Sequence, residues 1–317
     1  MMQKYLFVSS AIILAAALQV WSVTSEDASC ASDDALVFSE PNLVTSTDAL
    51  FLQRYNEPRF VIQPDAKLTA WDGSKRTADQ HFDWMLTHVK KMVASETPGF
   101  KVTGERDGVV YEQHAGLTEA ANGVGYFRLS ADVDISPKLF AALMGEPKML
   151  KAMDNTIRIM DFSRSPSFPS NEAGKRKIWL CYFRQSPGIL LPDLDGLDVS
   201  GWTIGDDGVV WQVAMGLPDL LPLHPATLTN LYPPAFRSLD MYWGYRLEPI
   251  GEGGTQTKLT LVCQHDLRNW MIPNFLLNRM VGDVLADYVR TAETVGKSIV
   301  ERGEETVLLK RLGLLVA

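Results

Sequence analysis

Residues 257–278 read TKLTLVCQHDLRNWMIPNFLLN, and this stretch predicts a strand, a short connection and the first turns of a long helix. In the strand, Leu259, Leu261 and Cys263 alternate with other side chains, as on a strand with one apolar face. After Pro273 the apolar period becomes that of a helix, with one row at Leu277, Val281, Leu285 and Val289. The pattern continues to about Glu301, which at ~1.5 Å per residue gives a helix of about 40 Å.

The strand predicted directly before this stretch has a matching apolar face. Residues 238–250 place four apolar side chains on one side, at Met241, Trp243, Tyr245 and Leu247. The glycine-rich turn 251–254 joins the two strands, so they lie antiparallel and their apolar faces form one continuous surface. The apolar side of the long helix is suited to cover that surface.

The rest of the chain supplies further strands and three shorter helices. An amphipathic helix is predicted over 78–94 and two short helices over 137–144, capped by Ser136 and stopped by Gly145, and over 147–153. Further strands are predicted at 100–104, 108–114, 123–135, 156–162, 177–184 and 209–215. The order predicts an α+β fold, in which a curved antiparallel sheet wraps around the long C-terminal helix.

The first 25 residues have the pattern of a secretory signal peptide. Lys4 precedes the charge-free run 5–20, and Val23 and Ser25 suit cleavage after Ser25. Residues 5–23 are also nearly long enough to remain as an uncleaved membrane anchor. We therefore expect a protein of the secretory pathway or a secreted protein, with membrane anchoring through this segment as the alternative.

The remaining chain divides into a leader, a domain and a tail. Residues 26–75 are acidic and interrupted by prolines, and we expect this leader to be partly disordered. The compact domain is predicted over 76–301. The apolar tail 302–317 combines leucines with Lys310 and Arg311, which suits a membrane contact, with packing on the domain or disorder as the alternatives.

Several motifs resemble the START (steroidogenic acute regulatory protein-related lipid transfer) domain family, most closely its sterol-handling branch. They are the Thr-Lys-Leu-Thr strand at 257–260, the turn from Asp266 to Trp270, the helix-opening Pro273, and Asn278 inside the helix. An acidic strand end and a second helix-opening proline also match, at Asp132, Asp134 and Pro137. The likeness covers about 76–301.

The resemblance implies a helix-grip fold whose sheet and last helix enclose a hydrophobic tunnel for one sterol or phospholipid. The sequence departs from the family pattern in three places. Asn269 stands where the family has glycine, and one extra residue separates Trp270 from Pro273. No arginine occurs in 192–202, where the family carries a cavity arginine, so the usual polar partner of the ligand is in doubt.

Under this resemblance, residues on the predicted inward face become candidate lipid contacts. They are Trp211, Val213, Met215, Trp243, Tyr245, Leu259, Leu261, Cys263, Phe275 and Met280. An ordinary sheet core explains the same residues without a ligand. The apolar loop 186–198 is the candidate gate, with packing on the domain core as the alternative. Its gate residues are Ile189, Leu190, Leu191 and Leu194.

Four polar residues are candidates for anchoring the polar end of a lipid: Arg184, Gln212, Arg237 and Arg246. For the arginines, the alternative is a surface salt bridge. Gln212 directly follows Trp211 in a strand and therefore lies on the opposite face, so the alternative is that it points out of the tunnel.

Composition and motifs argue against other functions. Lys and Arg total 30 against 38 Asp and Glu, and the formal net charge of −8 disfavours binding to nucleic acid. The histidines form no HExxH pattern and there is no nucleophile elbow, so we expect no enzyme, no cofactor and no metal site. The pair His265 and Asp266 could be imagined as a catalytic base, but Asp266 is better explained as a cap.

The three cysteines lack the spacing of a metal site. Cys181 and Cys263 lie in strands, as buried thiols or, in an oxidising compartment, as a disulfide. We therefore expect a monomer that binds a hydrophobic lipid, transfers it between membranes and contacts a membrane surface transiently. The alternatives are an enzyme of the same fold acting on a small apolar substrate, and a lipid sensor that does not transfer its ligand.

Overall fold

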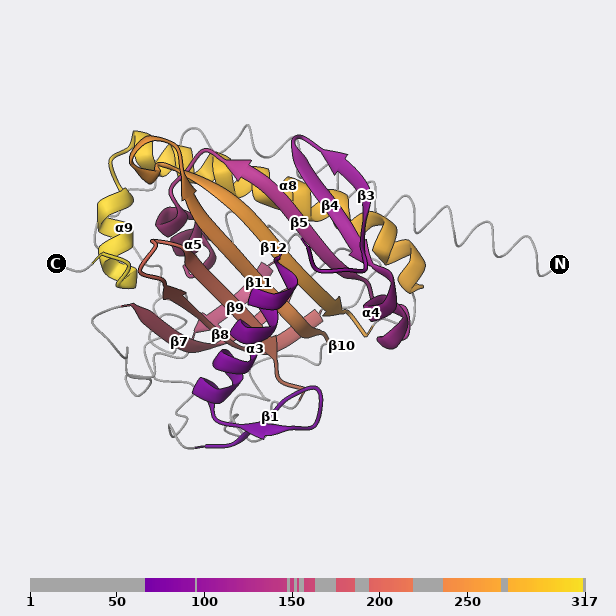
Figure 1. The fold of residues 1–317 in the computed structure, drawn as a ribbon. Helices are drawn as coiled ribbons and strands as arrows, with labels where there is room; N and C mark the ends of the chain where they lie inside the picture. The colour runs from indigo at the N-terminus through magenta and orange to yellow at the C-terminus, as the bar shows by residue number, and fades with distance from the viewer. Residues whose placement is uncertain are drawn as a thin grey trace.

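A curved β-sheet forms the centre of the molecule, with one long helix across one face and a shorter helix on the other (Figure 1). The structure, a computed structural model, describes residues 66–94, 96–146, 149–150, 153, 157–162, 175–185, 194–218, 236–268 and 273–315. The predicted signal peptide and most of the leader therefore lie outside the described residues.

The large sheet has the strand order β3-β4-β5-β12-β11-β9-β8-β7-β6, and β10 pairs with β8. The strands are β3 (Phe100–Arg106), β4 (Val109–His114), β5 (Tyr126–Val133), β6 (Ile157–Phe162), β7 (Arg176–Gln185), β8 (Leu194–Ile204), β9 (Val210–Gly216), β10 (Phe236–Arg237), β11 (Leu239–Ile250) and β12 (Gln256–Asp266). The short β10 runs parallel to β8, and the pairings along the main path are antiparallel. A small hairpin precedes the sheet, formed by β1 (Leu68–Thr69) and β2 (Lys75–Arg76).

The helices begin where the sequence supplies caps. They are α3 (Ala78–Met92), α4 (Ala115–Ala120), α5 (Pro137–Met144), α8 (Asn274–Glu301) and α9 (Glu305–Leu312). Thr77 and Gln80 form a capping box at the start of α3. At α5, Ser136 accepts a hydrogen bond from the Leu139 N–H, and Pro137 takes the first helical position.

The β11–β12 hairpin forms the predicted apolar surface. Trp243 lies opposite Cys263, Tyr245 opposite Leu261, and Leu247 opposite Leu259. The connecting turn contains three glycines with positive φ, which favours residues without a Cβ: Gly251 (76°), Gly253 (67°) and Gly254 (69°).

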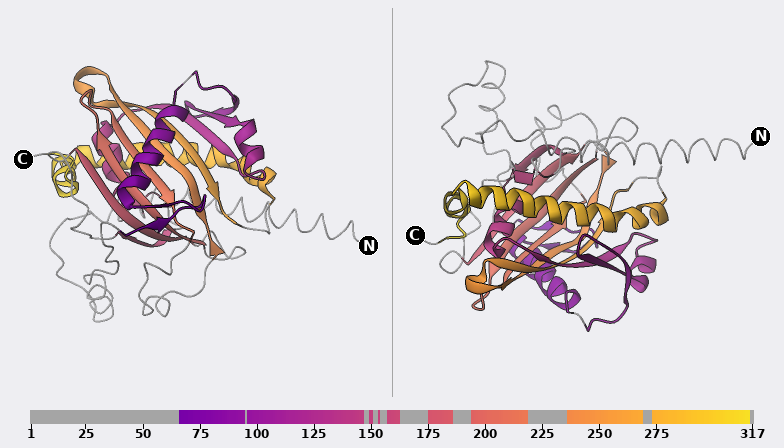
Figure 2. Two further views of the ribbon diagram at one scale, coloured as in Figure 1. Left: turned by 60° about the horizontal axis from the view of Figure 1, so that its bottom comes forward. Right: turned by 90° about the horizontal axis from the view of Figure 1, so that it is seen from above.

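Each face of the sheet has its own apolar core, because successive side chains of a strand point to opposite sides. α3 packs on one face through Phe82, Met85 and Val89. α8 packs on the other through Leu285, Val289 and Ala292, together with α5 and α9. Two further views show α3 and α8 on opposite sides of the sheet (Figure 2). We call these the α3 face and the α8 face.

The predicted fold class is confirmed: an antiparallel sheet curves around a long C-terminal helix, with an N-terminal helix before it. The second predicted short helix falls partly outside the described residues, of which 149–150 and 153 are helical. The elements α4 and β8 were not predicted, and neither were the short strands β1, β2 and β10 or the helix α9. The apolar run before Trp202 had been interpreted as a loop, but from Leu194 onward it is a strand buried on both faces, which lacks the alternation typical of half-buried strands.

The C-terminal tail packs on the domain. Leu308, Leu309 and Leu314 of the α9 region are buried in the core of the α8 face. The Ser136 hydroxyl donates a hydrogen bond to Glu305 at 3.0 Å, which ties α9 to the start of α5. Of the three interpretations of the tail, packing on the domain is the one observed. Among the helices that the structure describes, none combines the length and apolar character needed to cross a bilayer.

Candidate functional site

The α8 face carries the aromatic and aliphatic residues predicted from the hairpin. Trp243, Tyr245, Leu259, Leu261 and Cys263 belong with α8 to one core. Burial raises the pKa of the Cys263 thiol, so this cysteine is a neutral, unreactive lining group. Cys263 forms no disulfide, so the alternative of a disulfide between it and Cys181 is excluded.

Two residues at the centre of this face remain partly accessible to solvent. Trp243 is on β11 and Ala214, its cross-strand partner, is on β9. Their neighbours Tyr245 and Ser200 are buried. Central strands beneath a helix are normally closed off from water. The sheet and α8 therefore do not close completely over this row.

Gln212 also faces α8. Its cross-strand partners are Trp202 on β8 and Tyr245 on β11, and both belong to the core of the α8 face. The side chain is 6% exposed, and its carbonyl oxygen Oε1 is buried without a hydrogen-bond partner. Of the two interpretations made from the sequence, the inward one is therefore observed. A buried acceptor without a donor is rare in folded proteins.

Two tyrosine hydroxyls converge close to this row. The hydroxyl of Tyr245 on β11 and that of Tyr288 on α8 both donate to the Met144 sulfur, at 3.8 and 3.4 Å. A thioether is a weak acceptor. Burial raises the pKa of Tyr245, so its hydroxyl stays protonated and available as a donor.

Three titratable groups occupy the end of the same face where β12 leaves the sheet. His265 Nδ1 contacts the Asp240 carboxylate directly, and Asp240 also hydrogen-bonds to Asp198. Burial disfavours the charged forms, but the mutual attraction outweighs it: the pKa of His265 is raised and that of Asp240 is lowered. The imidazole is thus paired with Asp240 and not with its sequence neighbour Asp266. The Asp266 carboxylate instead accepts the Arg268 N–H at 2.7 Å, as the capping interpretation predicted.

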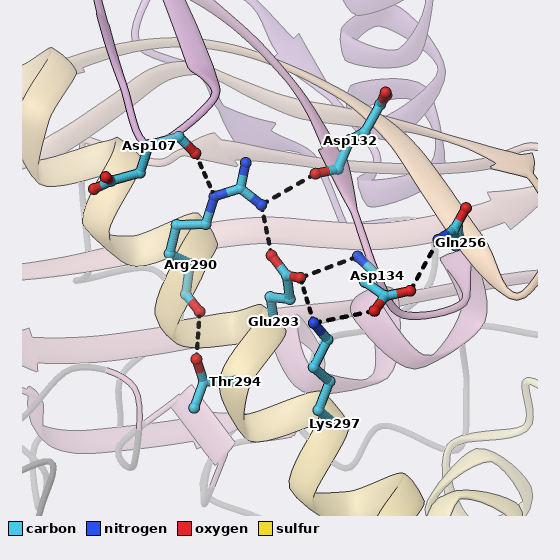
Figure 3. Close-up of polar contacts among 8 residues, drawn as sticks. All are labelled: Asp107, Asp132, Asp134, Gln256, Arg290, Glu293, Thr294 and Lys297. Carbon is cyan, nitrogen blue, oxygen red and sulfur yellow. Dashed lines mark hydrogen bonds and ion pairs between the residues drawn. The ribbon is translucent and has the colours of Figure 1, made fainter.

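The C-terminal half of α8 is held to the sheet by Arg290, which lies over the β3–β4 turn and the end of β5 (Figure 3). Arg290 Nε donates to the Asp107 carbonyl at 2.9 Å, and Nη1 donates to the Asp132 carbonyl at 3.1 Å. Nη1 also pairs with Glu293 one turn later. Three acceptors for one guanidinium fix the side chain and the helix with it.

Lys297 makes the second attachment, one turn after Glu293 (Figure 3). Its ammonium lies 2.9 Å from Glu293 and 3.1 Å from Asp134. The Gln256 amide donates to the same Asp134 at 3.0 Å. These hydrogen bonds, first from Gln256 and then from Lys297, hold the pKa of Asp134 below its usual value. We call Arg290, Glu293, Lys297 and Asp134 the α8 latch.

The N-terminal half of α8 is attached by separate contacts along its length. The Asn274 amide donates to the Asn122 carbonyl at 3.1 Å, and Asp287 pairs with Arg106 at 2.9 Å. The Asn278 amide accepts from the Gly125 N–H at 3.0 Å and donates to the Gly123 carbonyl at 2.9 Å. Tyr111 donates to Asp283 at 2.8 Å. Three apolar side chains of this half are exposed to solvent: Phe275 by 70%, Met280 by 41% and Val284 by 57%.

Several predicted lipid contacts are wrong in their placement. Trp211, Val213 and Met215 do lie on one face of β9, but that face packs against α3. The pattern of β9 shows two apolar faces, and the side facing α8 was assigned incorrectly. Met280 is five residues before the buried Leu285, about 140° around the helix at ~100° per residue, and therefore points outward. Phe275 lies exposed in the first turn of α8.

Most polar anchor candidates also lie elsewhere. Arg246 directly follows the inward Tyr245 and points to the opposite face, where it pairs with Glu248 at 3.0 Å; the salt-bridge alternative is observed. Arg184 is buried on the face that Tyr182 shares with α3. For Arg237 the backbone, in β10, is described but the side chain is not.

The gate prediction is only partly covered by the structure. Ile189, Leu190 and Leu191 lie outside the described residues. Leu194 is the first residue of β8 and is 4% exposed, so it belongs to the sheet and not to a loop. Sequence reasoning missed Asp240 and Asp198. Only the β11–β12 register, with its bulge between Asp240 and Tyr242, places Asp240 opposite His265.

Solved structures of two human proteins share this arrangement of sheet and helices. StAR-related lipid transfer protein 5 gives a TM-score of 0.55 at 15% identity, covering 70% of this chain and 97% of that protein. STARD10 gives a TM-score of 0.52 at 13% identity, covering 69% of this chain and 82% of that protein. The chain has the START fold. No protein-family model and no curated protein matches the sequence. Function must therefore be argued from the residues that this START fold brings together.

Proposed function

We propose that the chain binds one hydrophobic lipid between the α8 face of its sheet and α8, and transfers it between membranes. The observation that carries the proposal is the partial accessibility of Trp243 and Ala214 in the middle of an otherwise buried apolar face. The START fold, shared with a protein named for lipid transfer, supports the same assignment.

Apolar contact alone is sufficient for tight binding. Each methylene of a lipid that leaves water contributes ~0.8 kcal/mol. The residues available for such contacts on this face are apolar: Leu259, Leu261 and Cys263 on β12, and Trp243 and Tyr245 on β11. A lipid held there needs few polar contacts, which orient it more than they bind it.

We infer that the lipid enters where the N-terminal half of α8 covers the sheet. This half is attached through separate contacts of Asn274, Asn278, Asp283 and Asp287, whereas the C-terminal half carries the connected α8 latch. The exposed Phe275, Met280 and Val284 supply apolar surface for a transient membrane contact. Separation of this half from the sheet at a membrane would admit the lipid, and closure would remove it from water.

Filling the accessible row tests the binding site. We expect Ala214→Trp to occupy the space beside Trp243 and to abolish binding of dehydroergosterol and of fluorescent phosphatidylcholine, with the fold retained by circular dichroism. Ala120→Trp, at an exposed position of α4, is the matched control and should bind like the wild type. Extraction of the purified protein followed by mass spectrometry should yield about one lipid per chain. Normal lipid binding by folded Ala214→Trp would refute the proposed site.

An enzyme of the same fold is the second candidate, and one observation favours it. His265 and Asp240 form a charged pair on the α8 face, at the end where β12 leaves the sheet. Such a pair can move a proton to or from a bound substrate. Conversion of an extracted ligand by the wild type but not by His265→Gln would establish an enzyme. If the wild type and His265→Gln transfer lipid between vesicles at equal rates, the chain is a carrier. Lipid binding without transfer would favour a sensor.

We propose further that the chain enters the secretory pathway, with its first 25 residues as the signal. The charge-free run after Lys4 supports this. Sequencing the N-terminus of the protein expressed in eukaryotic cells tests it. A mature chain that begins at Glu26 would support cleavage, whereas an intact Met1 in a membrane fraction would support the anchor.

A further inference from the structure

The proposed lipid site contains a polar group whose hydrogen-bonding capacity is unused. We propose that Gln212 recognises the hydroxyl of an uncharged lipid alcohol and selects it over a phospholipid. This inference rests on the proposed function and names the ligand class of that same site. The chemistry is a hydrocarbon body carrying one O–H donor, as in a sterol or a diacylglycerol.

The contrast between two buried glutamines supports a ligand-binding role for Gln212. Gln264 on β12, 2% exposed, donates from its amide to the Val124 carbonyl at 2.9 Å and to the Leu117 carbonyl at 3.4 Å. Gln212 is 6% exposed and its Oε1 has no donor. An unsatisfied buried acceptor destabilises the ligand-free fold, so a leucine or methionine would be the better core residue. A hydroxyl from a ligand would supply the missing donor.

The position of Gln212 fits this role. Ala214, two residues later on the same strand face, is partly accessible, so the amide lies next to the region that the sheet and α8 leave open. Its cross-strand neighbours Trp202 and Tyr245 are flat aromatic side chains. They offer contact surface for a rigid ring system on either side of the amide.

The charges on the same face favour a neutral ligand. Asp198 and Asp240 are 5% and 8% exposed, and they share the face with His265, whose charge is directed at Asp240. A phosphate brought to this face would lack a free cation to pair with among the described residues, because His265 is already paired with Asp240, and it would lose its hydration without compensation. An alcohol experiences neither effect and gains the hydrogen bond to Gln212.

Two matched pairs of lipids test the proposal, and they also distinguish whether the lipid alcohol is a sterol or a diacylglycerol. Cholesterol is compared with cholest-5-ene, which lacks the hydroxyl, and dioleoylglycerol with dioleoyl phosphatidic acid, which carries a phosphate. Each competes with dehydroergosterol, detected by energy transfer from the tryptophans of the purified protein. We expect the wild type to prefer the alcohol of at least one pair by about tenfold. The pair with the larger preference identifies a sterol or an acylglycerol.

The variants assign the preference to the residue. Gln212→Met should reduce the tenfold preference to about twofold or less, and Gln212→Leu serves as a second variant of different shape. Gln264→Met, on the α3 face, should retain the wild-type preference. Equal binding of both members of each pair, a preference for phosphatidic acid, or an unchanged preference in Gln212→Met would overturn the inference and leave lipid binding intact. Failure of the wild type to bind dehydroergosterol and every competitor would overturn the proposed function itself.

Discussion

Replacing Gln212 with methionine should stabilise the ligand-free protein. The substitution removes a buried Oε1 that has no donor and substitutes an apolar chain of similar length. Leaving such a group unsatisfied costs about 1–3 kcal/mol, whereas fitting a slightly larger side chain costs less than about 1.5 kcal/mol. We expect the free energy of unfolding to rise by about 1 kcal/mol.

The matched substitution Gln264→Met should have the opposite sign. It removes two hydrogen bonds and leaves the Val124 carbonyl without the Gln264 donor, while the Leu117 carbonyl keeps the Ala121 N–H at 3.1 Å. At about 0.5–1.5 kcal/mol for each bond, the expected loss is about 1–3 kcal/mol. The two variants therefore differ by about 2–4 kcal/mol, although both change a buried glutamine of a central strand to methionine.

Urea unfolding of delipidated protein, followed by tryptophan fluorescence and circular dichroism, measures the difference. The dependence of the unfolding free energy on urea should be the same in wild type and variants, so that the midpoints report stability. If Gln212→Met is destabilised as much as Gln264→Met, the Gln212 amide is satisfied in the ligand-free protein, and the reasoning that it is held for a ligand fails.

Three further predictions concern α8 and the charged pair. The pKa of His265 is raised, so its contribution to stability is complete below its ordinary value of 6.5 and is lost as pH rises through the raised value. The contribution of Asp240 to stability is present above its ordinary pKa of 3.8 and is lost as pH falls through the lowered pKa. Urea unfolding from pH 3 to 9 should show both losses of stability. His265→Gln should remove the loss at the higher pH. Asn278→Ala deletes two hydrogen bonds of the N-terminal half of α8 and should accelerate vesicle-to-vesicle lipid transfer up to about tenfold. Lys297→Met, in the α8 latch, should not accelerate the transfer. Equal transfer rates for the two variants would contradict lipid entry at the N-terminal half. In Gly282→Ala the new Cβ would lie 2.4 Å from the Tyr111 ring, so overpacking of about 1–3 kcal/mol should exceed a gain of ~1 kcal/mol in helix propensity; a lower melting temperature that Tyr111→Ala restores would confirm it.

The placement of the long hairpin and its closing helix could be read from the sequence because both patterns are local. Leu259, Leu261 and Cys263 share one strand face, and a four-residue row continues through Leu285 and Val289. Each pattern depends on the period of its own element. The structure agrees with both, and with the α+β architecture that follows from them.

The candidate site was predicted less well because it depends on which face of a strand points to α8. β9 is apolar on both sides, and its alternation fits either orientation equally. Trp211, Val213 and Met215 were therefore assigned to the ligand, although they contact α3. β8 was missed for the same reason, since a strand buried on both faces has no alternation to recognise.

By itself the amino-acid sequence determined the strands of the hairpin, the helix α8 and the apolar side of each. It also showed that nucleophile and metal-binding motifs are absent. These properties are carried by residues close together in the chain. Only the tertiary structure decided that Gln212 faces α8 and that His265 pairs with Asp240 rather than Asp266. The register of neighbouring strands and the covering of each face set these contacts. Both arise from residues far apart in sequence, which no local period encodes.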